Sequence, residues 1–304
     1  MANSTSGRIT TVVENFWASF TRGDDLERVG KLMSIVSPDA ASIKVTNLAT
    51  TGSGGFTSSW AGTASPTVKD FTATAGSAVT PAAYAKRMVL EKYTAADNPD
   101  ILADIGVKMG QEAQYKLAGL AYTALAGVFS EDHPIQAGKK VVDTLANIDN
   151  SASAALSAST LKTARSVMRQ GANTDGDIVG MAPSNLVVPA ELESTAKEIV
   201  FSSAFGGSSA GDNNLLNTLN PATNSGIVGV QVIEQLADAN NWFLVADASM
   251  NPNRAFAKLW LRDGIEFIVS EVEATKQLSF HVSFRAVVYY PPECELGIYG
   301  SIVA

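Results

Sequence analysis

Residues 98–129 read NPDILADIGVKMGQEAQYKLAGLAYTALAGVF, and they carry the strongest structural pattern in the chain. Asn98 suits an N-cap, Pro99 suits the first helical position, and Asp100 complements the positive end of the helix dipole. Apolar residues then recur at helical spacing: Leu102, Ile105, Met109, Ala113, Leu117, Leu120, Ala124 and Val128. We expect one helix of roughly 45–48 Å, a length that suits a protein spanning distance better than one holding an active site.

Four glycines interrupt this helical pattern: Gly106, Gly110, Gly119 and Gly127. Each costs about 0.5–1 kcal/mol relative to alanine in a helix, so a freestanding rod would avoid them. They are expected where another backbone approaches closely. The best candidate in the sequence is the strand from Leu278 to Tyr290.

That strand is the second strong pattern. Every second residue from Leu278 is apolar, and Gln277, Ser279, His281, Ser283 and Arg285 between them are polar. The alternation predicts a strand with one wet face and a length of about 46 Å, close to that of the helix. Residues 265–273 are expected to pair with it through a turn at Lys276 and Gln277.

The first 90 residues predict two extensions from the body. Residues 10–36 predict a helical arm with Phe16, Trp17 and Phe20 on its apolar face. Residues 41–83 have two short alternating pieces, 43–45 and 68–71, among many glycines, and cannot fold alone. An extended hairpin that packs on a neighbouring subunit would explain them, and disorder is the alternative.

The middle of the chain predicts an α/β lobe with exposed loops, so the fold class is α+β. Its expected elements are a strand or loop at 141–148, a helix capped by Ser157 or Ser159 and ending near Gln170, a strand at 185–189, a helix at 190–201, and strands at 227–233 and 242–248. A separate strand at 84–93 is expected to lead into the long helix.

Composition excludes several classes of protein. The chain has 304 residues, 46% hydrophobic and only 17% charged, with a net charge of −8 and no basic patch for phosphate neutralisation. Its single cysteine, Cys294, excludes an intrachain disulfide and fits a reducing compartment. Neither a signal peptide nor an apolar stretch of about 18 residues is present, so we expect no membrane segment.

Short motifs do not assemble into an active site. Residues 159–162 match S-x-x-K, but its S-D-N and K-T-G partners are absent, which favours a helix cap with a surface lysine. The glycines at 206–211 lack the Lys-Ser/Thr of a phosphate loop. Asp175 and Asp177 lack the spacing and closing glutamate of a calcium loop, so a plain turn is expected.

Histidine and cysteine give no better candidate. His133 and His281 have no partner at metal-ligand spacing, and Cys294 has no recognisable histidine partner. We therefore expect no catalytic residue, no cofactor-binding residue and no metal ligand. The protein is expected not to be an enzyme, with a soluble α/β enzyme of unrecognised site as an alternative.

The order of these segments resembles the major capsid proteins of tailed bacteriophages, which share the Hong Kong 97 fold, and most of all the Mu-like phage major head subunit. The residues that carry the resemblance are the helix exit at 129–134 (FSEDHP), the helix at 157–170, the step at 186–193 (LVVPAELE), and the strand–loop–strand at 227–247. The resemblance covers most of the chain.

The resemblance implies a division of the chain into an N-terminal arm (1–41), an extended loop with its strand (42–94), a peripheral domain (95–140 with 265–304) and an axial domain (141–264). It implies a structural subunit that forms pentamers and hexamers in an icosahedral shell around double-stranded DNA, without sequence-specific binding. The arm begins almost at Met1, which leaves no room for a cleavable scaffolding region, so scaffolding, portal and decoration proteins are expected to be separate.

Two further expectations follow from the resemblance. The protein is expected in the virion, after synthesis and assembly in the host cytoplasm, and an encapsulin-type nanocompartment is the alternative shell. Some relatives link subunits through a Lys–Asn bond; Lys69 is the obvious loop lysine, but no partner asparagine can be assigned.

Overall fold

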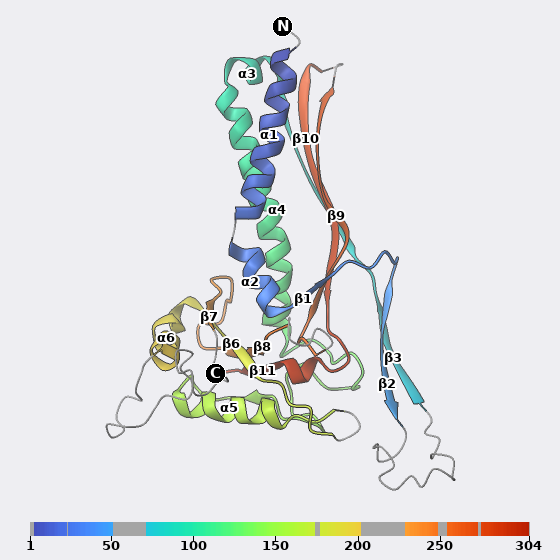
Figure 1. The fold of residues 1–304 in the computed structure, drawn as a ribbon, viewed down its shortest axis with the longest axis vertical. Coiled ribbons are helices and arrows are strands. Elements are labelled where there is room, and N and C mark those ends of the chain that lie inside the picture. Colours follow the sequence, from blue (N-terminus) through green and yellow to red (C-terminus); the bar gives the residue numbers. More distant parts are fainter. Residues whose placement is uncertain are drawn as a thin grey trace, which may run out of the picture.

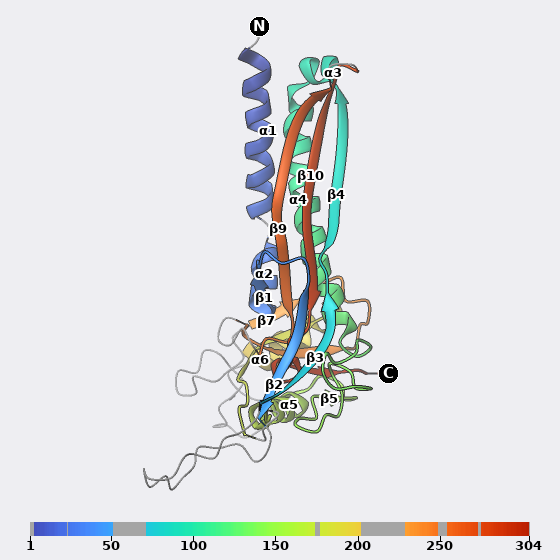
Figure 2. The same ribbon diagram turned by 90° about the vertical axis from the view of Figure 1, so that its right-hand side faces the viewer.

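The computed structural model describes residues 3–22, 24–50, 71–173, 177–201, 229–248, 254–272 and 275–303. A long tower rises from a broader foot, and a hairpin projects beside the foot (Figures 1 and 2). The tower consists of α1 (Asn3–Arg22), α3 (Lys92–Asp97), α4 (Pro99–Gly127) and a sheet with strand order β1-β9-β10-β4. The strands of this sheet are β1 (Ser34–Val36), β9 (Lys258–Val272), β10 (Gln277–Tyr289) and β4 (Ala82–Glu91).

The long helix and the long hairpin of the tower confirm the sequence prediction. α4 has 29 residues and therefore extends about 44 Å at 1.5 Å per residue. β10 pairs antiparallel with β9 on one side and β4 on the other, while β1 joins β9 in parallel. β9 begins at Lys258, seven residues before the predicted start, and the hairpin turns at Lys276, which adopts a φ of 52°.

The apolar face of β10 packs toward the helices. Leu278, Phe280 and Val282 are buried in one cluster with Leu102, Ile105 and Met109 of α4 and with Val12 and Phe16 of α1. The opposite face is less exposed to solvent than predicted. The Ser279 side chain is buried, and its Oγ accepts a hydrogen bond from Arg87 Nε at 2.8 Å. Arg87 belongs to the neighbouring strand β4, so a side chain from a flanking strand covers part of that face.

Two of the glycines of α4, Gly106 and Gly110, face a helix and not the strand that the sequence suggested. A β-carbon on Gly106 would lie 2.5 Å from the carbonyl oxygen of Val12, and one on Gly110 would lie 2.5 Å from that of Phe16. α1 therefore packs backbone to backbone against α4. Gly119 meets nothing within 4 Å, so close approach does not explain it.

Several element ends differ from the prediction. The arm is not one helix: α1 is followed by α2 (Asp24–Leu32) and then by β1. The strand predicted to reach Tyr93 ends at Glu91, where α3 begins. Asn98 precedes α4, but its side chain does not cap the helix; its Nδ2 donates instead to the carbonyl of Thr94 at 3.4 Å.

The foot is built on a second sheet with strand order β5-β11-β8-β6-β7. Its strands are β5 (Ser151–Ala152), β11 (Ile298–Ser301), β8 (Trp242–Ala246), β6 (Pro183–Val188) and β7 (Gly229–Val232), flanked by α5 (Ala158–Gln170), η1 (Ala190–Leu192) and α6 (Glu193–Phe201). β6 and β8 are fully buried, as their apolar sequences predict. Residues 141–148, for which the sequence predicted either a strand or a loop, form a loop.

The C-terminal strand joins the foot and not the tower. The sequence grouped residues 265–304 with the long helix, yet β11 pairs antiparallel with β8 and parallel with β5. The chain leaves β10 through Pro291 and the short helix η2 (Cys294–Gly297) and enters the second sheet. A continuous core that includes Leu125, Phe243 and Ala286 crosses this junction, so tower and foot share buried surface.

The glycine-rich segment forms a two-stranded hairpin, which we call the hairpin arm. It consists of β2 (Ile43–Thr50) and β3 (Phe71–Val79), paired antiparallel from Ile43↔Val79 to Thr50↔Phe71. Of the predicted strand piece at 68–71, only Phe71 lies within the described residues, as the first residue of β3, and Lys69 lies outside them. Within the described ranges, no helix is both long and apolar enough to cross a membrane.

Candidate subunit interface

The hairpin arm is set apart from the rest of the described structure. It lies apart from the tower sheet and runs down beside the foot (Figures 1 and 2). Its base is fixed where Gly76 faces the loop that follows α4: a β-carbon on Gly76 would lie 2.5 Å from the carbonyl oxygen of Pro134. A two-stranded hairpin alone is marginally stable in water, so further surface is needed to cover it.

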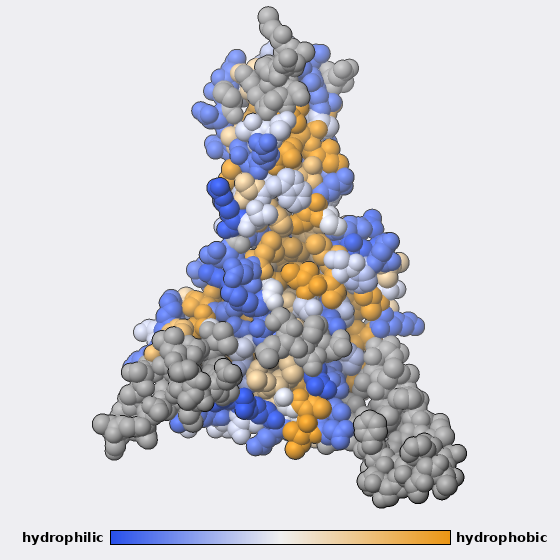
Figure 3. Space-filling view, in the orientation of Figure 1, coloured by the Kyte–Doolittle hydropathy of each residue, from blue (hydrophilic) through white to orange (hydrophobic). Residues whose placement is uncertain are grey.

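Large apolar side chains are exposed along the tower. Figure 3 shows apolar surface in a strip that follows the tower toward the foot. The tower residues with large exposed apolar side chains are Trp17, Ile35, Val89, Tyr93, Ile101, Tyr115 and Ile268. Tyr93 is 71% exposed at one end of the tower, and Tyr115 is 55% exposed halfway along α4. Apolar surface of this extent is typical of a protein that associates.

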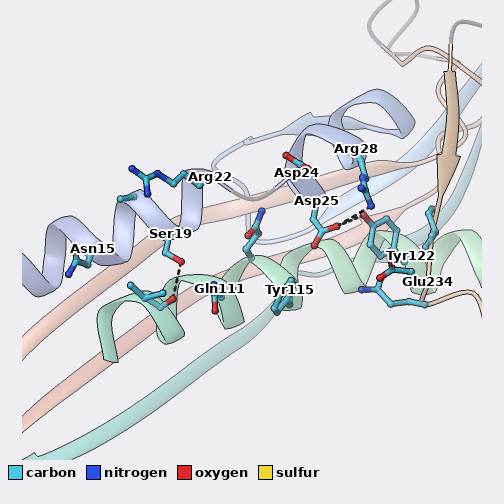
Figure 4. A pocket seen from close by; sticks show the side chains of 15 residues that line it. Asn15, Ser19, Arg22, Asp24, Asp25, Arg28, Gln111, Tyr115, Tyr122 and Glu234 are labelled. Atoms are coloured by element: carbon cyan, nitrogen blue, oxygen red, sulfur yellow. Dashed lines mark hydrogen bonds and ion pairs between the residues drawn. The ribbon is translucent and has the colours of Figure 1, made fainter. Parts of the chain in front are cut away.

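A polar cleft of about 720 Å³ opens between α1, α2 and α4 (Figure 4). Ser19 Oγ donates to the carbonyl of Val107 at 3.0 Å, and Tyr122 Oη donates to Asp25 Oδ1 at 3.2 Å. Burial, with the nearby Asp25 carboxylate second, raises the pKa of the Tyr122 hydroxyl. Because Ser19 is bonded to a carbonyl and not to a base, the cleft contains no activated nucleophile.

Two residues 162 positions apart meet at the junction of tower and foot. His133 Nε2 lies 2.9 Å from Glu295 Oε2, and both side chains are fully buried. Asn147 Nδ2 donates to Glu295 Oε1 at 2.8 Å. The backbone N–H of Gln136 donates to His133 Nδ1 at 3.1 Å, so the ring proton is on Nε2 and is donated to Glu295. No local sequence pattern predicts this pair, because its members are far apart in the chain.

Cys294 adds a third potential ligand, with its Sγ within 4.8 Å of ligand atoms of His133 and Glu295. The geometry does not suit a metal. A metal-bound histidine normally donates its second ring N–H, whereas Nδ1 of His133 accepts a hydrogen bond from the backbone. Burial, with Glu295 second, raises the pKa of the Cys294 thiol, which disfavours the thiolate that a metal needs. The cluster is a hydrogen-bond network.

The other residues weighed as chemical candidates are not brought together. Ser159 lies in the first turn of α5, and Ser157, not Ser159, caps that helix. Asp177 belongs to a turn in which its N–H donates to Asn173 Oδ1, while Asp175 lies outside the described residues. His281 pairs in register with Arg87 and Ile268 on the outer side of the sheet. The loop at 206–211 is also outside the described ranges.

Comparison with known proteins identifies this architecture. A family model described as phage capsid protein matches residues 74–290, which is well over half of the chain. The chain belongs to the phage capsid protein family. It is a structural major capsid protein of the bacteriophage head, and no individually curated protein matches it.

Solved structures support the same fold for this capsid protein. A cyanophage P-SCSP1u capsid aligns with a TM-score of 0.56 at 10% identity, covering 90% of this chain and 86% of that one. A phage-related protein from Bordetella bronchiseptica aligns with a TM-score of 0.54 at 14% identity, covering 94% and 95%. A virus-like particle from Pyrococcus furiosus aligns with a TM-score of 0.52 at 12% identity, covering 96% and 98%. The fold is therefore of the Hong Kong 97 type, as predicted.

Proposed function

We propose that this capsid protein builds an icosahedral shell from rings of five and six copies, with the hairpin arm of each copy lying over its neighbour. Contacts between unlike surfaces of identical subunits close into rings when the rotation closes. The arm supplies one such surface, since β2 and β3 project from the body (Figure 1). The exposed apolar residues of the tower supply the other.

The described elements suggest roles for the predicted segments. In this proposal the foot, with its five-stranded sheet, is the axial domain at the centre of each ring. The tower is the peripheral domain that carries contacts between rings, and 1–41 is the N-terminal arm. The family relation to the Mu-like head subunit remains a prediction.

The proposed contents of the shell follow from charge. A chain with a net charge of −8 is suited to an inner wall that holds double-stranded DNA without gripping it. In the proposal, scaffolding, portal and decoration proteins are separate chains. The subunit has no enzymatic activity, assembles in the cytoplasm of the bacterial host and ends in the virion.

Replacing residues 47–74 by Asn-Gly tests the role of the hairpin arm. Thr46 and Ala75 are paired in the ladder, so a two-residue turn can close it there, remove the outer part of β2 and β3 and keep Gly76. We expect folded, soluble subunits that form no shells in electron microscopy. Normal particles from this variant would contradict the proposal, and a second variant with a scrambled 47–74 sequence separates the effect of length from that of side chains.

A nanocompartment shell is the alternative, and no observation favours it over a phage shell. The family that matches is one of phage capsid proteins. Particles purified from infected or induced cells distinguish the two. Double-stranded DNA inside them supports the proposal, whereas an enclosed enzyme without DNA supports the alternative.

A further inference from the structure

We propose that the turn at residues 133–136 is a seat that sets the direction of the hairpin arm, and that the His133–Glu295 pair is the positioning device that holds this seat. The inference rests on the proposed function only for its consequence in assembly. The contact between the seat and the hairpin arm lies within one subunit, so the direction of the arm can be measured on the unassembled protein.

The arm touches the seat at a position where only glycine fits. A β-carbon on Gly76 would lie 2.5 Å from the carbonyl oxygen of Pro134 and 3.3 Å from that of Val45. The ladder between β2 and β3 is irregular at this point, with a register shift between Lys44 and Thr46. Such an irregularity bends a hairpin locally, so a contact here governs the angle of everything beyond it.

The seat is rigid because hydrogen bonds hold it from both ends. The backbone N–H groups of Ile135 and Gln136 donate to His133 Nδ1 at 3.4 and 3.1 Å, which closes the turn around Pro134. The His133 backbone N–H donates to the carbonyl of Lys139 at 2.8 Å. The carbonyl of Pro134 is therefore fixed relative to the His133 ring.

The His133 ring is in turn fixed to the foot. Its Nε2 donates to Glu295, whose other oxygen accepts from Asn147 Nδ2. Asn150 Nδ2 donates to the carbonyls of Glu295 and Ile298 at 3.2 and 3.1 Å, which ties the same segment to β11. A chain of contacts thus runs from the second sheet through Glu295 and His133 to the base of the arm.

Spin labels on the unassembled subunit test this proposal. One label is placed at Ala73, in the part of β3 beyond the seat, and the other at Ala126, which is exposed on α4. The native Cys294 is fully buried and stays unlabelled. Pulsed electron spin resonance should give one narrow distance distribution, and Gly76→Ala should shift or broaden it.

Gly264→Ala is the matched control, because a β-carbon there meets nothing within 4 Å, and it should leave the distribution unchanged. If Gly76→Ala does not fold, Pro134→Gly replaces it, since this change loosens the turn and leaves Gly76 as it is. An unchanged distance distribution in a folded Gly76→Ala or Pro134→Gly protein would overturn the proposal that this turn sets the direction of the arm.

The role of His133 is tested by a pair of variants. His133→Leu removes the donor to Glu295 and should broaden the distribution, whereas His133→Gln keeps a side-chain N–H for Glu295 and should restore most of the narrow distribution. A lower unfolding midpoint in His133→Leu with unchanged distances would mean that the pair stabilises the fold without positioning the arm, and would overturn this part. These results are independent of shell formation, which the 47–74 replacement tests.

Discussion

Gly106 of α4 and Val12 of α1 are in backbone contact: a β-carbon on Gly106 would lie 2.5 Å from the Val12 carbonyl oxygen. One turn further, Gly110 has the same relationship with Phe16. The two glycines form a notch into which α1 fits. The ring of Phe16 then stacks on Phe267 of β9 with centroids 4.2 Å apart, so the notch also sets how deeply α1 enters the sheet.

We therefore expect Gly106→Ala to lower the free energy of unfolding of the subunit by about 1–3 kcal/mol, because the added methyl group forces the two helices apart. Gly119→Ala is the control on the same helix: its β-carbon meets nothing, and the gain in helix propensity should stabilise the subunit by about 0.5–1 kcal/mol. Urea unfolding of both variants measures these changes in the free energy of unfolding. Equal effects would mean that α1 is not held by the notch.

The capping box of α5 gives a second prediction. Ser157 Oγ accepts from the Thr160 N–H at 3.2 Å, and Thr160 Oγ1 accepts from the Ser157 N–H at 2.9 Å. Ser157→Ala should cost about 1 kcal/mol of stability. Ser159→Ala, two residues on at an exposed position, should cost much less. If Ser159→Ala proved the more damaging, the helix would start later than the structure indicates.

Alkaline pH should weaken the fold through Tyr290. Its hydroxyl donates to the carbonyl of Ala124 at 2.7 Å, and burial, with the Glu131 carboxylate second, raises its pKa. Because the folded pKa exceeds the unfolded value of about 10, this stabilisation is complete below pH ~10 and is lost as pH rises above it.

The urea midpoint of the native subunit should accordingly stay level up to about pH 10 and fall as the pH rises above that value. Tyr290→Phe should lower the midpoint at neutral pH but flatten its decline at high pH. Tyr115→Phe, at a residue that is 55% exposed, is the control and should follow the native curve. A parallel decline for Tyr290→Phe and the native protein would refute the assignment.

Two glutamates with basic or histidine partners should respond very differently to the same substitution. Glu295 is fully buried and accepts from His133 and Asn147, so Glu295→Gln places an amide N–H against a donor and should cost about 1–3 kcal/mol. Glu112 pairs with Lys86 where both side chains are partly exposed, so Glu112→Gln should cost less than about 1 kcal/mol. Thermal unfolding at low and high salt compares them, and only the Glu112 effect should depend on salt.

The sequence determined the regular part of this capsid protein. Helical spacing from Leu102 onward predicted α4, and alternation from Leu278 predicted β10, because a long element exposes a repeating face that its own residues must match. The absence of a core pattern at 41–83 predicted an extended hairpin, and β2 and β3 pair as one. These features depend on neighbours a few residues apart.

Only the tertiary structure decided which elements meet. The glycines of α4 signalled a close backbone but could not name α1 as the partner, since a glycine carries no side chain that complements a particular surface. His133 and Glu295 have no distinctive local pattern, and the sequence held no signal that β11 pairs with β8 in the foot. Contacts between residues more than 50 positions apart depend on how the whole chain packs, and local sequence patterns do not encode them.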